Sequence, residues 1–213
     1  MDAAEAGLFD IMRSTRSMRR LKPDPVPDAL VQQLLEAGTA AANGGNMQSW
    51  RFLVVKDPAI KAAAGAWYKR GWDEIVGPRY AAGGPAPGTT PEQFGRMLAA
   101  AEYLAAHIHE APVWIVPCLV GGTPTRSSGS SIYPAVQNIL LAARALGLGT
   151  TLTTLHLLFE KEVEAALGLP EGARSYAILP IGWPMGKFGP VRRAPLDEVV
   201  YLDRWGEAWQ PNG

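Results

Sequence analysis

Cysteine and histidine are scarce in this sequence, and their scarcity excludes several kinds of site. Cys118 is the one cysteine among 213 residues, so no intramolecular disulfide can form and no thiolate metal site can be built from it alone. Three histidines do not compensate, because His107 and His109 are two positions apart on an expected helix and point in different directions. We expect no metal site, and we expect Cys118 to be a small core residue in an apolar strand.

Long apolar runs, net charge and a secretory signal are also missing. The longest apolar candidate, APVWIVPCLV at 111–120, is far shorter than the about 20 residues of a membrane-spanning helix, and two prolines interrupt it. The first ten residues carry acids where a secretory signal would carry positive charge. Lys and Arg number 20, as do Asp and Glu, which argues against a general nucleic-acid-binding face. These features predict a cytoplasmic protein with no membrane span and no nucleic-acid partner.

Motifs of common catalytic and nucleotide-binding sites are absent as well. The sequence has no GxSxG nucleophile elbow, no Walker A motif, and no GxGxxG after an expected strand. Its 47% hydrophobic and 19% charged residues are nevertheless typical of a folded globular protein. The chemistry of the chain must therefore rest on something other than these side-chain and phosphate-binding motifs.

Hydrophobic periodicity predicts an α+β chain. Helices are expected at 1–12, 28–42, 58–70, 91–109, 132–147 and 160–168, and strands at 50–55, 112–120, 150–155, 175–183 and 199–203. Asp28 follows Pro27 and is the expected N-cap of its helix. The segment 76–91, VGPRYAAGGPAPGTTP, is rich in glycine and proline and is expected to be a mobile insertion. We find no internal repeat and predict one domain over 1–213.

Positive charge gathers at residues 13–22, RSTRSMRRLK, where five of ten side chains are cationic. Within this basic stretch, Arg16-Ser17-Met18-Arg19 places two guanidiniums and a hydroxyl close together, which suits one small anion such as a phosphate. Solvated arginines that complement the C-terminal dipole of the preceding helix explain the same residues equally well. An arm that binds nucleic acid is a third interpretation, which the balanced charge disfavours.

A second polar cluster, NGGNMQ at 43–48, separates an expected helix from an expected strand. Its glycines let the backbone approach a flat ligand, while Asn46 and Gln48 each offer a hydrogen-bond donor and an acceptor. Such an amide edge matches a heterocycle with alternating C=O and N–H groups. An ordinary turn uses the same residue types, so both interpretations stay open at this point.

Several segments, taken in order, resemble the FMN-dependent nitroreductase family. They are RSMRRLKPDPVP (16–27), GNMQSWRFLVV (45–55), AVQNILLAARALGLGTT (135–151), LPEGARSYAILPIGWPMGK (169–187) and RRAPL (192–196). Residues 65–110 resemble the family least and are a candidate substrate lid. The resemblance implies an α+β fold with a central mixed or antiparallel sheet flanked by helices. It also implies an intertwined homodimer with FMN sites at the subunit interface.

The resemblance further implies which residues bind FMN. The group that would hold the phosphate and ribityl chain is Arg16, Ser17, Arg19, Arg192 and Arg193, with Arg19 the candidate cation for the reduced ring. The loop residues that would meet the ring from the other subunit are Asn43, Gly44, Asn46 and Gln48. The backbone that would face the ring near its N5 belongs to Thr153, Thr154 and Leu155. No side-chain triad is needed, because the flavin itself carries the redox chemistry.

The activity implied is a two-step cycle in which NAD(P)H reduces FMN and an electron-poor acceptor then takes the electrons. Nitroaromatics, quinones and activated alkenes are acceptors of this kind. Trp67, Tyr68, Trp72 and Tyr80 would stack on the acceptor, although Trp67 and Tyr68 could instead pack their helix on the core. Alternatives on the same fold are azoline oxidation, reductive dehalogenation, fragmentation of the flavin, and flavin binding without catalysis.

Overall fold

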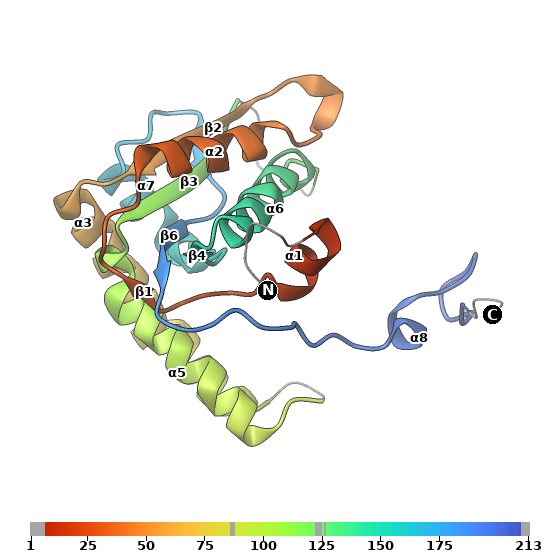
Figure 1. Cartoon of the computed structure of the whole chain (residues 1–213). Coiled ribbons are helices and arrows are strands. Elements are labelled where there is room, and N and C mark those ends of the chain that lie inside the picture. Colours follow the sequence, from red (N-terminus) through yellow and green to blue (C-terminus); the bar gives the residue numbers. More distant parts are fainter. Residues whose placement is uncertain (1–6, 86–87, 122–124, 126, 210–213) are drawn as a thin grey trace.

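A six-stranded sheet with helices on both faces forms the body of the molecule (Figure 1). This computed structural model describes residues 7–85, 88–121, 125 and 127–209. The strands run in the order β1-β6-β3-β2, with β4 also pairing β6 and β5 pairing β3, and every pairing is antiparallel. Their bounds are β1 (Leu21–Lys22), β2 (Trp50–Val55), β3 (Val113–Val120), β4 (Gly149–Thr150), β5 (Ala173–Ser175) and β6 (Leu179–Pro184). The predicted α+β fold with a central antiparallel sheet is confirmed.

Strand β3 lies at the centre of the sheet and contributes to the cores on both faces. Trp114, Val116 and Cys118 belong to the core cluster on one face, whereas Val113 and Ile115 belong to a cluster on the other face, and Leu119 belongs to a third, smaller cluster. Alternate residues of a strand point to opposite faces, and a strand covered on both faces is apolar along its whole length. Cys118 is only 1% exposed, as predicted, and its burial raises the pKa of the thiol to about 12.

Two groups of helices cover the two faces of the sheet. Helices α2 and α6 pack over one core, and α3, α5 and α7 over the other. Gly38 lets α2 approach α6 closely, since a Cβ there would lie 3.0 Å from the side chain of Ile139. The helix bounds are α1 (Leu8–Ser14), α2 (Asp28–Thr39), α3 (Pro58–Gly71), α4 (Gly77–Gly83), α5 (Pro91–His107), α6 (Gly129–Ala145), α7 (Glu160–Ala166) and α8 (Leu196–Val199). Among the described helices, none has the length and apolar character to cross a membrane.

The segment after α3 differs from its prediction. A π-helical stretch, Trp72–Val76, joins α3 to α4, so residues 77–83 are helical where an irregular insertion was expected. Pro78 lies directly after the π-helical stretch, whose wider turn already departs from the regular i to i−4 hydrogen-bond pattern that a proline interrupts. Residues 86–87 of the predicted insertion lie outside the described residues.

Other element boundaries also differ from those predicted. Pro27, not Asp28, occupies the N-cap position of α2, and Asp28 is its first helical residue. In place of the strand expected at 175–183, the structure has two strands, β5 and β6. Of the strand expected at 150–155, only Thr150 is in a strand, at the end of β4, and a 3-10 helix begins at Leu155 and ends at Phe159. The strand expected at 199–203 is wrong: α8 ends at Val199, and an isolated bridge joins Tyr201 to Ala208. The first helix begins at Leu8; residues 1–6 of its predicted range lie outside the described part.

Residues 188–209 form an extended arm that carries α8 away from the sheet (Figure 1). Large apolar side chains on this C-terminal arm are exposed, among them Leu196, Val199 and Trp205, the last to 90%. The arm begins shortly after β6, beside the N-terminal basic stretch. Its first residues therefore belong to the body of the molecule, and its end does not pack on the described part of the sheet.

Candidate functional site

The basic stretch runs along the edge of the sheet and is fixed there by its own backbone. The Met18 N–H donates to the Thr150 carbonyl of β4 at 2.9 Å, and β1 pairs with the end of β6. The Arg16 guanidinium donates to the Lys187 carbonyl at 3.1 Å, at the start of the C-terminal arm. The stretch, β4 and the arm, which are far apart in sequence, thus meet at one place.

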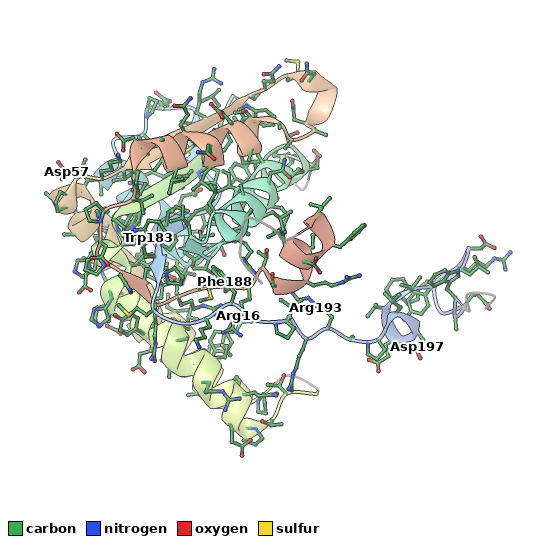
Figure 2. The ribbon with its side chains drawn as sticks, in the orientation of Figure 1. Arg16, Asp57, Trp183, Phe188, Arg193 and Asp197 are labelled. Atoms are coloured by element: carbon green, nitrogen blue, oxygen red, sulfur yellow. The ribbon has the colours of Figure 1, made fainter. Side chains whose placement is uncertain are left out.

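An inner cavity opens where these segments meet. Its polar lining includes Arg16, Ser17, Arg144 and Arg193, and its other lining residues are Met12, Thr15, Gln137, Leu140, Leu148, Thr150, Thr151, Leu152 and Phe188. The Arg144 guanidinium lies over the Phe188 ring at 4.3 Å and donates to Ser14 Oγ at 3.0 Å. Arg16, Phe188 and Arg193 lie along the same stretch of the molecule in Figure 2. None of the described lining residues is acidic, so the cavity has the charge of an anion site.

An outer cavity shares Arg16, Ser17 and Arg193 with the inner one. It adds side chains from α5 and the arm, namely Gln93, Arg96, Pro190, Val191 and Arg192. The structure thus brings together four of the predicted phosphate-binding residues, but Arg192 lines only the outer cavity. Arg13 and Arg20 of the basic stretch line neither cavity; their guanidiniums lie over the rings of Phe9 and Tyr103.

A third, aromatic cavity holds Arg19 together with Tyr68, Trp72 and Tyr80. It is completed by Val76, Ala101, Leu104 and residues 151–155. The Tyr68 hydroxyl and Thr153 Oγ1 are hydrogen-bonded at 2.8 Å. Burial raises the pKa of the Tyr68 phenol above its ordinary value, whereas the Thr153 hydrogen bond and the Arg19 charge oppose that rise. The phenol therefore keeps its proton at neutral pH.

The aromatic cavity adjoins the inner cavity, because Thr151 and Leu152 line both. The predicted ring-facing residues Thr153, Thr154 and Leu155 follow directly and line the aromatic cavity. One short segment between β4 and the following 3-10 helix therefore connects the arginine-rich end of the site to its aromatic end. The whole site is elongated, with cations at one end and flat walls at the other.

Trp67 does not join the other predicted aromatic residues. It packs on the core with its ring 5.3 Å from that of Phe159, and the Arg70 guanidinium lies over it at 5.3 Å. Trp67 lines none of the three cavities, and its packing favours the core-packing alternative; its contact with an acceptor stays a prediction. Tyr68 serves both purposes, since it is buried in the core and also lines the aromatic cavity.

The loop residues Asn43, Gly44, Asn46 and Gln48 line none of the three cavities of their own chain. The loop is internally ordered: the Gln48 N–H donates to Asn43 Oδ1 at 2.9 Å, and the Gln48 amide donates to Asn46 Oδ1 at 3.3 Å. Asn46 and Gln48 have φ of 53° and 48°, in the left-handed region that non-glycine residues seldom adopt. Such residues occur at functional sites more often than elsewhere.

A buried polar chain begins one residue after Leu155. His156, which is completely buried, lies with Nε2 3.1 Å from Ser175 Oγ, and this hydroxyl lies 3.0 Å from Glu164 Oε1. Because the carboxylate must accept the Ser175 proton, His156 Nε2–H donates to Ser175 and its Nδ1 carries a lone pair. Nδ1 has no hydrogen-bond partner among the described residues, and burial lowers the pKa of His156 to about 4.

Sequence reasoning missed Gln93, Arg96 and Arg144. Gln93 belongs to the capping box that begins α5, Arg144 lies in the family-like segment 135–151 with no role assigned to it, and Arg96 has no neighbouring motif. All three lie near the basic stretch because of how α5 and α6 pack. The spacing of Gln137, Leu140 and Arg144 at i, i+3 and i+7 does place them on one face of α6. Across the described residues, no three His, Cys, Asp or Glu side chains are grouped to hold a metal ion.

Comparisons with known proteins identify the family. The nitroreductase family model matches residues 12–183, and the chain therefore belongs to the nitroreductase family. An NADH dehydrogenase of Thermus thermophilus is 33% identical over 221 residues, which cover 94% of this chain and 95% of the relative. A 5,6-dimethylbenzimidazole synthase of Rhodospirillum rubrum is 30% identical over 188 residues, which cover 84% and 82%.

Solved structures agree with this assignment. Oxidized iodotyrosine deiodinase, crystallised with FMN and 3-iodo-L-tyrosine, matches with a TM-score of 0.71 and 25% identity, over 93% of this chain and 99% of that one. The resemblance found in the sequence motifs is thus confirmed. Because these relatives are named for different reactions, family membership establishes the fold and the class of protein but not the substrate.

Proposed function

We propose that the chain is an FMN-dependent oxidoreductase that passes electrons from NAD(P)H to an electron-poor acceptor such as a nitroaromatic, a quinone or an activated alkene. The observation that carries this proposal is that the inner and aromatic cavities are adjacent and share Thr151 and Leu152 as lining residues. A ligand with a phosphate at one end and a flat ring at the other matches such an elongated site.

The donor set of the inner cavity fits the phosphate of FMN. Arg16, Arg144 and Arg193 supply guanidiniums, and Ser17 supplies a hydroxyl, with no acidic side chain among the described lining residues. Thr150 Oγ1, on the same wall, is buried with no hydrogen-bond partner among the described residues, so it has capacity for a ligand donor or acceptor. FMN, when bound, supplies hydride and electron transfer at its ring.

The residues of the aromatic cavity orient the ring and the acceptor. Arg19 provides a cation that favours negative charge on a reduced ring, and the backbone at 153–155 forms a wall beside it. Tyr68, Trp72 and Tyr80 offer aromatic surfaces against which a planar acceptor can stack while water is excluded. These roles explain why the chain needs no nucleophile or metal of its own.

We extend the proposal to a homodimer in which the loop at 43–48 contacts the ring bound to the partner chain. Two observations support this extension. The loop residues have a strained backbone of the kind that occurs at functional sites, yet they lie outside the cavities of their own chain. The C-terminal arm exposes the large apolar side chains of Leu196, Val199 and Trp205. Sedimentation of the flavin-loaded protein should give the mass of two chains. A single-chain mass at micromolar concentration would contradict the dimer.

Flavin titration of the purified protein tests the cofactor proposal. Adding FMN to the flavin-free protein should produce a bound-flavin spectrum, which NADH or NADPH then bleaches and a quinone or nitroaromatic restores. Arg16→Gln should weaken FMN binding by about 10- to 100-fold, the worth of a charge-assisted hydrogen bond. Arg13→Gln is the matched control. It removes the same charge three residues before Arg16, and the Arg13 side chain lines neither arginine-rich cavity.

Two results would overturn the cofactor proposal. One is a protein that stays colourless at saturating FMN, and the other is equal weakening of FMN binding by Arg13→Gln and Arg16→Gln. A bound flavin that neither nicotinamide reduces would instead leave the cofactor in place and remove the donor from the proposal.

A second candidate function is dehalogenation or flavin fragmentation, which the names of the deiodinase and benzimidazole synthase relatives suggest. Reaction products separate these from the main proposal. Incubation of the reduced protein with 3-iodo-L-tyrosine would release iodide in the first case. Exposure to oxygen would consume the flavin ring in the second, whereas an NAD(P)H oxidoreductase regenerates it unchanged.

A further inference from the structure

The outer cavity carries more positive charge than one phosphate requires. Four guanidiniums line it, those of Arg16, Arg96, Arg192 and Arg193, together with Ser17 and Gln93. Among the described residues, neither Arg96 nor Arg192 takes part in an ion pair. Glu92, one turn before Arg96 on α5, is exposed and is not part of the cavity lining. The hydrogen bond with Thr90 and, to a smaller extent, the charge of Arg96 lower the pKa of the Glu92 carboxyl, so this carboxylate offsets part of one of the four charges. These arginines repel one another until an anion binds between them.

The inner cavity already accounts for one phosphate. A phosphate monoester carries a charge of about −1.5 to −2 at neutral pH, which Arg16, Arg144 and Arg193 match. Arg96 and Arg192 lie outside this inner set and face the outer cavity, which has a volume of about 590 Å³. Their planar guanidiniums can each donate two hydrogen bonds to phosphate oxygens. The outer cavity thus has the capacity to bind a second phosphate-bearing group beside the first.

Helix α5 joins this cavity to the aromatic cavity. Gln93 and Arg96 lie near its first turn and line the outer cavity, whereas Ala101 and Leu104 line the aromatic cavity. At the rise of an α-helix, Arg96 and Leu104 are separated by about 12 Å along the axis. Gln93 Oε1 accepts from the Thr90 N–H at 3.1 Å, so its amide nitrogen is left to donate elsewhere. One helix therefore presents an anion-binding end and an apolar end.

We propose that the outer cavity binds a phosphate of the nicotinamide dinucleotide whose nicotinamide ring enters the aromatic cavity. The inference rests on the proposed function, and it adds a subsite for the electron donor. In a nicotinamide dinucleotide the phosphates lie at a distance from the reactive ring. The outer and aromatic cavities are likewise separated along α5, so one such molecule matches both. Two groups can supply this phosphate: the pyrophosphate common to NADH and NADPH, or the 2′-phosphate of NADPH alone. The same arginine side chains would donate hydrogen bonds to either group.

Nucleotide binding without turnover tests this subsite. The flavin-loaded protein is titrated by calorimetry with ADP, which carries the pyrophosphate, and with 2′,5′-ADP, which carries the 2′-phosphate. Arg96→Gln and Arg192→Gln should each weaken binding of at least one probe by about tenfold. Arg96→Gln should leave the FMN dissociation constant within about twofold of the unmodified protein, because Arg96 does not line the inner cavity. Arg13→Gln should change neither probe.

The pattern across the two probes identifies the phosphate. Weakening of 2′,5′-ADP alone assigns the 2′-phosphate and predicts that Arg96→Gln raises the KM for NADPH but not for NADH. Weakening of ADP, with or without weakening of 2′,5′-ADP through its 5′-phosphate, assigns the pyrophosphate and predicts that both KM values rise together.

Other outcomes would overturn the proposal. It is wrong if neither probe binds the unmodified protein, or if both variants bind the probes unchanged. It is also wrong if Arg96→Gln weakens FMN as much as Arg16→Gln does, since Arg96 would then belong to the FMN phosphate site. The spectral titration with FMN is done first, so a failure of the flavin proposal itself is recognised separately.

Discussion

Acidification should destabilise this protein through one buried side chain, His156. Its ring is completely buried, its Nε2–H donates to Ser175, and its Nδ1 has no partner among the described residues. Protonation would place a cation where water cannot reach it, and for this reason burial lowers the pKa of His156 to about 4 from 6.5. In the unfolded chain the same ring accepts a proton at the higher pH. Between the two pKa values the unfolded state therefore binds more protons than the folded state.

The size of the effect follows from the two pKa values. Stability from a neutral buried His156 is fully present above pH 6.5 and is lost as the pH falls towards 4. At about 1.4 kcal/mol per pKa unit, the total loss is about 3 kcal/mol, of which about 2 kcal/mol falls between pH 7 and pH 5. This loss is a substantial part of the about 5–15 kcal/mol that holds a typical domain folded.

Urea unfolding at pH 7, 6 and 5, at one fixed protein concentration, measures this effect. His156→Gln keeps an amide that can donate to Ser175 but cannot take up a proton, so it should lose about 2 kcal/mol less than the unmodified protein between pH 7 and pH 5. His109→Gln is the control, because His109 is exposed, and its pH dependence should follow that of the unmodified protein. Equal slopes for the unmodified protein and His156→Gln would refute the reasoning.

Two further predictions concern packing and the aromatic cavity. Gly149→Ala would place a Cβ 3.1 Å from Met18 Cβ and should lower the free energy of unfolding by about 1–3 kcal/mol, as measured by urea unfolding. Gly95→Ala is the control, because an added Cβ there would meet no tertiary neighbour within 4 Å, and it should be neutral or stabilising; equal losses in the two variants would contradict the packing argument. Tyr68→Phe removes the hydrogen bond to Thr153 and should cost about 1 kcal/mol of stability. An unchanged unfolding midpoint would show that this hydrogen bond contributes nothing.

Sequence patterns predicted much of this fold because most elements have simple local causes. The apolar, β-branched character of WRFLVV at 50–55 predicted a strand with the bounds that the structure has, and the alanine-rich segment at 58–70 predicted α3 to within one residue. The prediction of an irregular segment at 76–91 was wrong at 77–83, because glycine and proline were taken there as helix breakers. Pro78 follows the π-helical stretch, where the regular helical hydrogen-bond pattern is already interrupted, and the helix continues from α3 without a loop.

Site residues could be predicted only where they lie in recognisable motifs. Arg16, Ser17 and Arg193 come from family-like segments, and the structure brings them to one cavity, although their binding of FMN stays a prediction. Arg96 has no local signature, and Arg144 lies in the family-like segment 135–151 without a feature that marks it as a ligand. The position of both depends on how α5 and α6 pack rather than on neighbouring residues. The role proposed for the loop at 43–48 involves a second chain, whose position a single sequence does not describe.

The start of the C-terminal arm is also part of the wall of the inner cavity. The Phe188 ring lies against the Arg144 guanidinium, and Arg193 lines the cavity, a few residues before the arm leaves the body (Figure 2). Whatever holds the end of the arm also limits how far this wall can move. Release of the arm would increase the conformational freedom of the wall, and a ligand bound there would have to restrict it again. In the proposed homodimer, a partner chain that holds the arm would link ligand retention to arm placement, and dilution or truncation that frees the arm would then favour loss of the ligand.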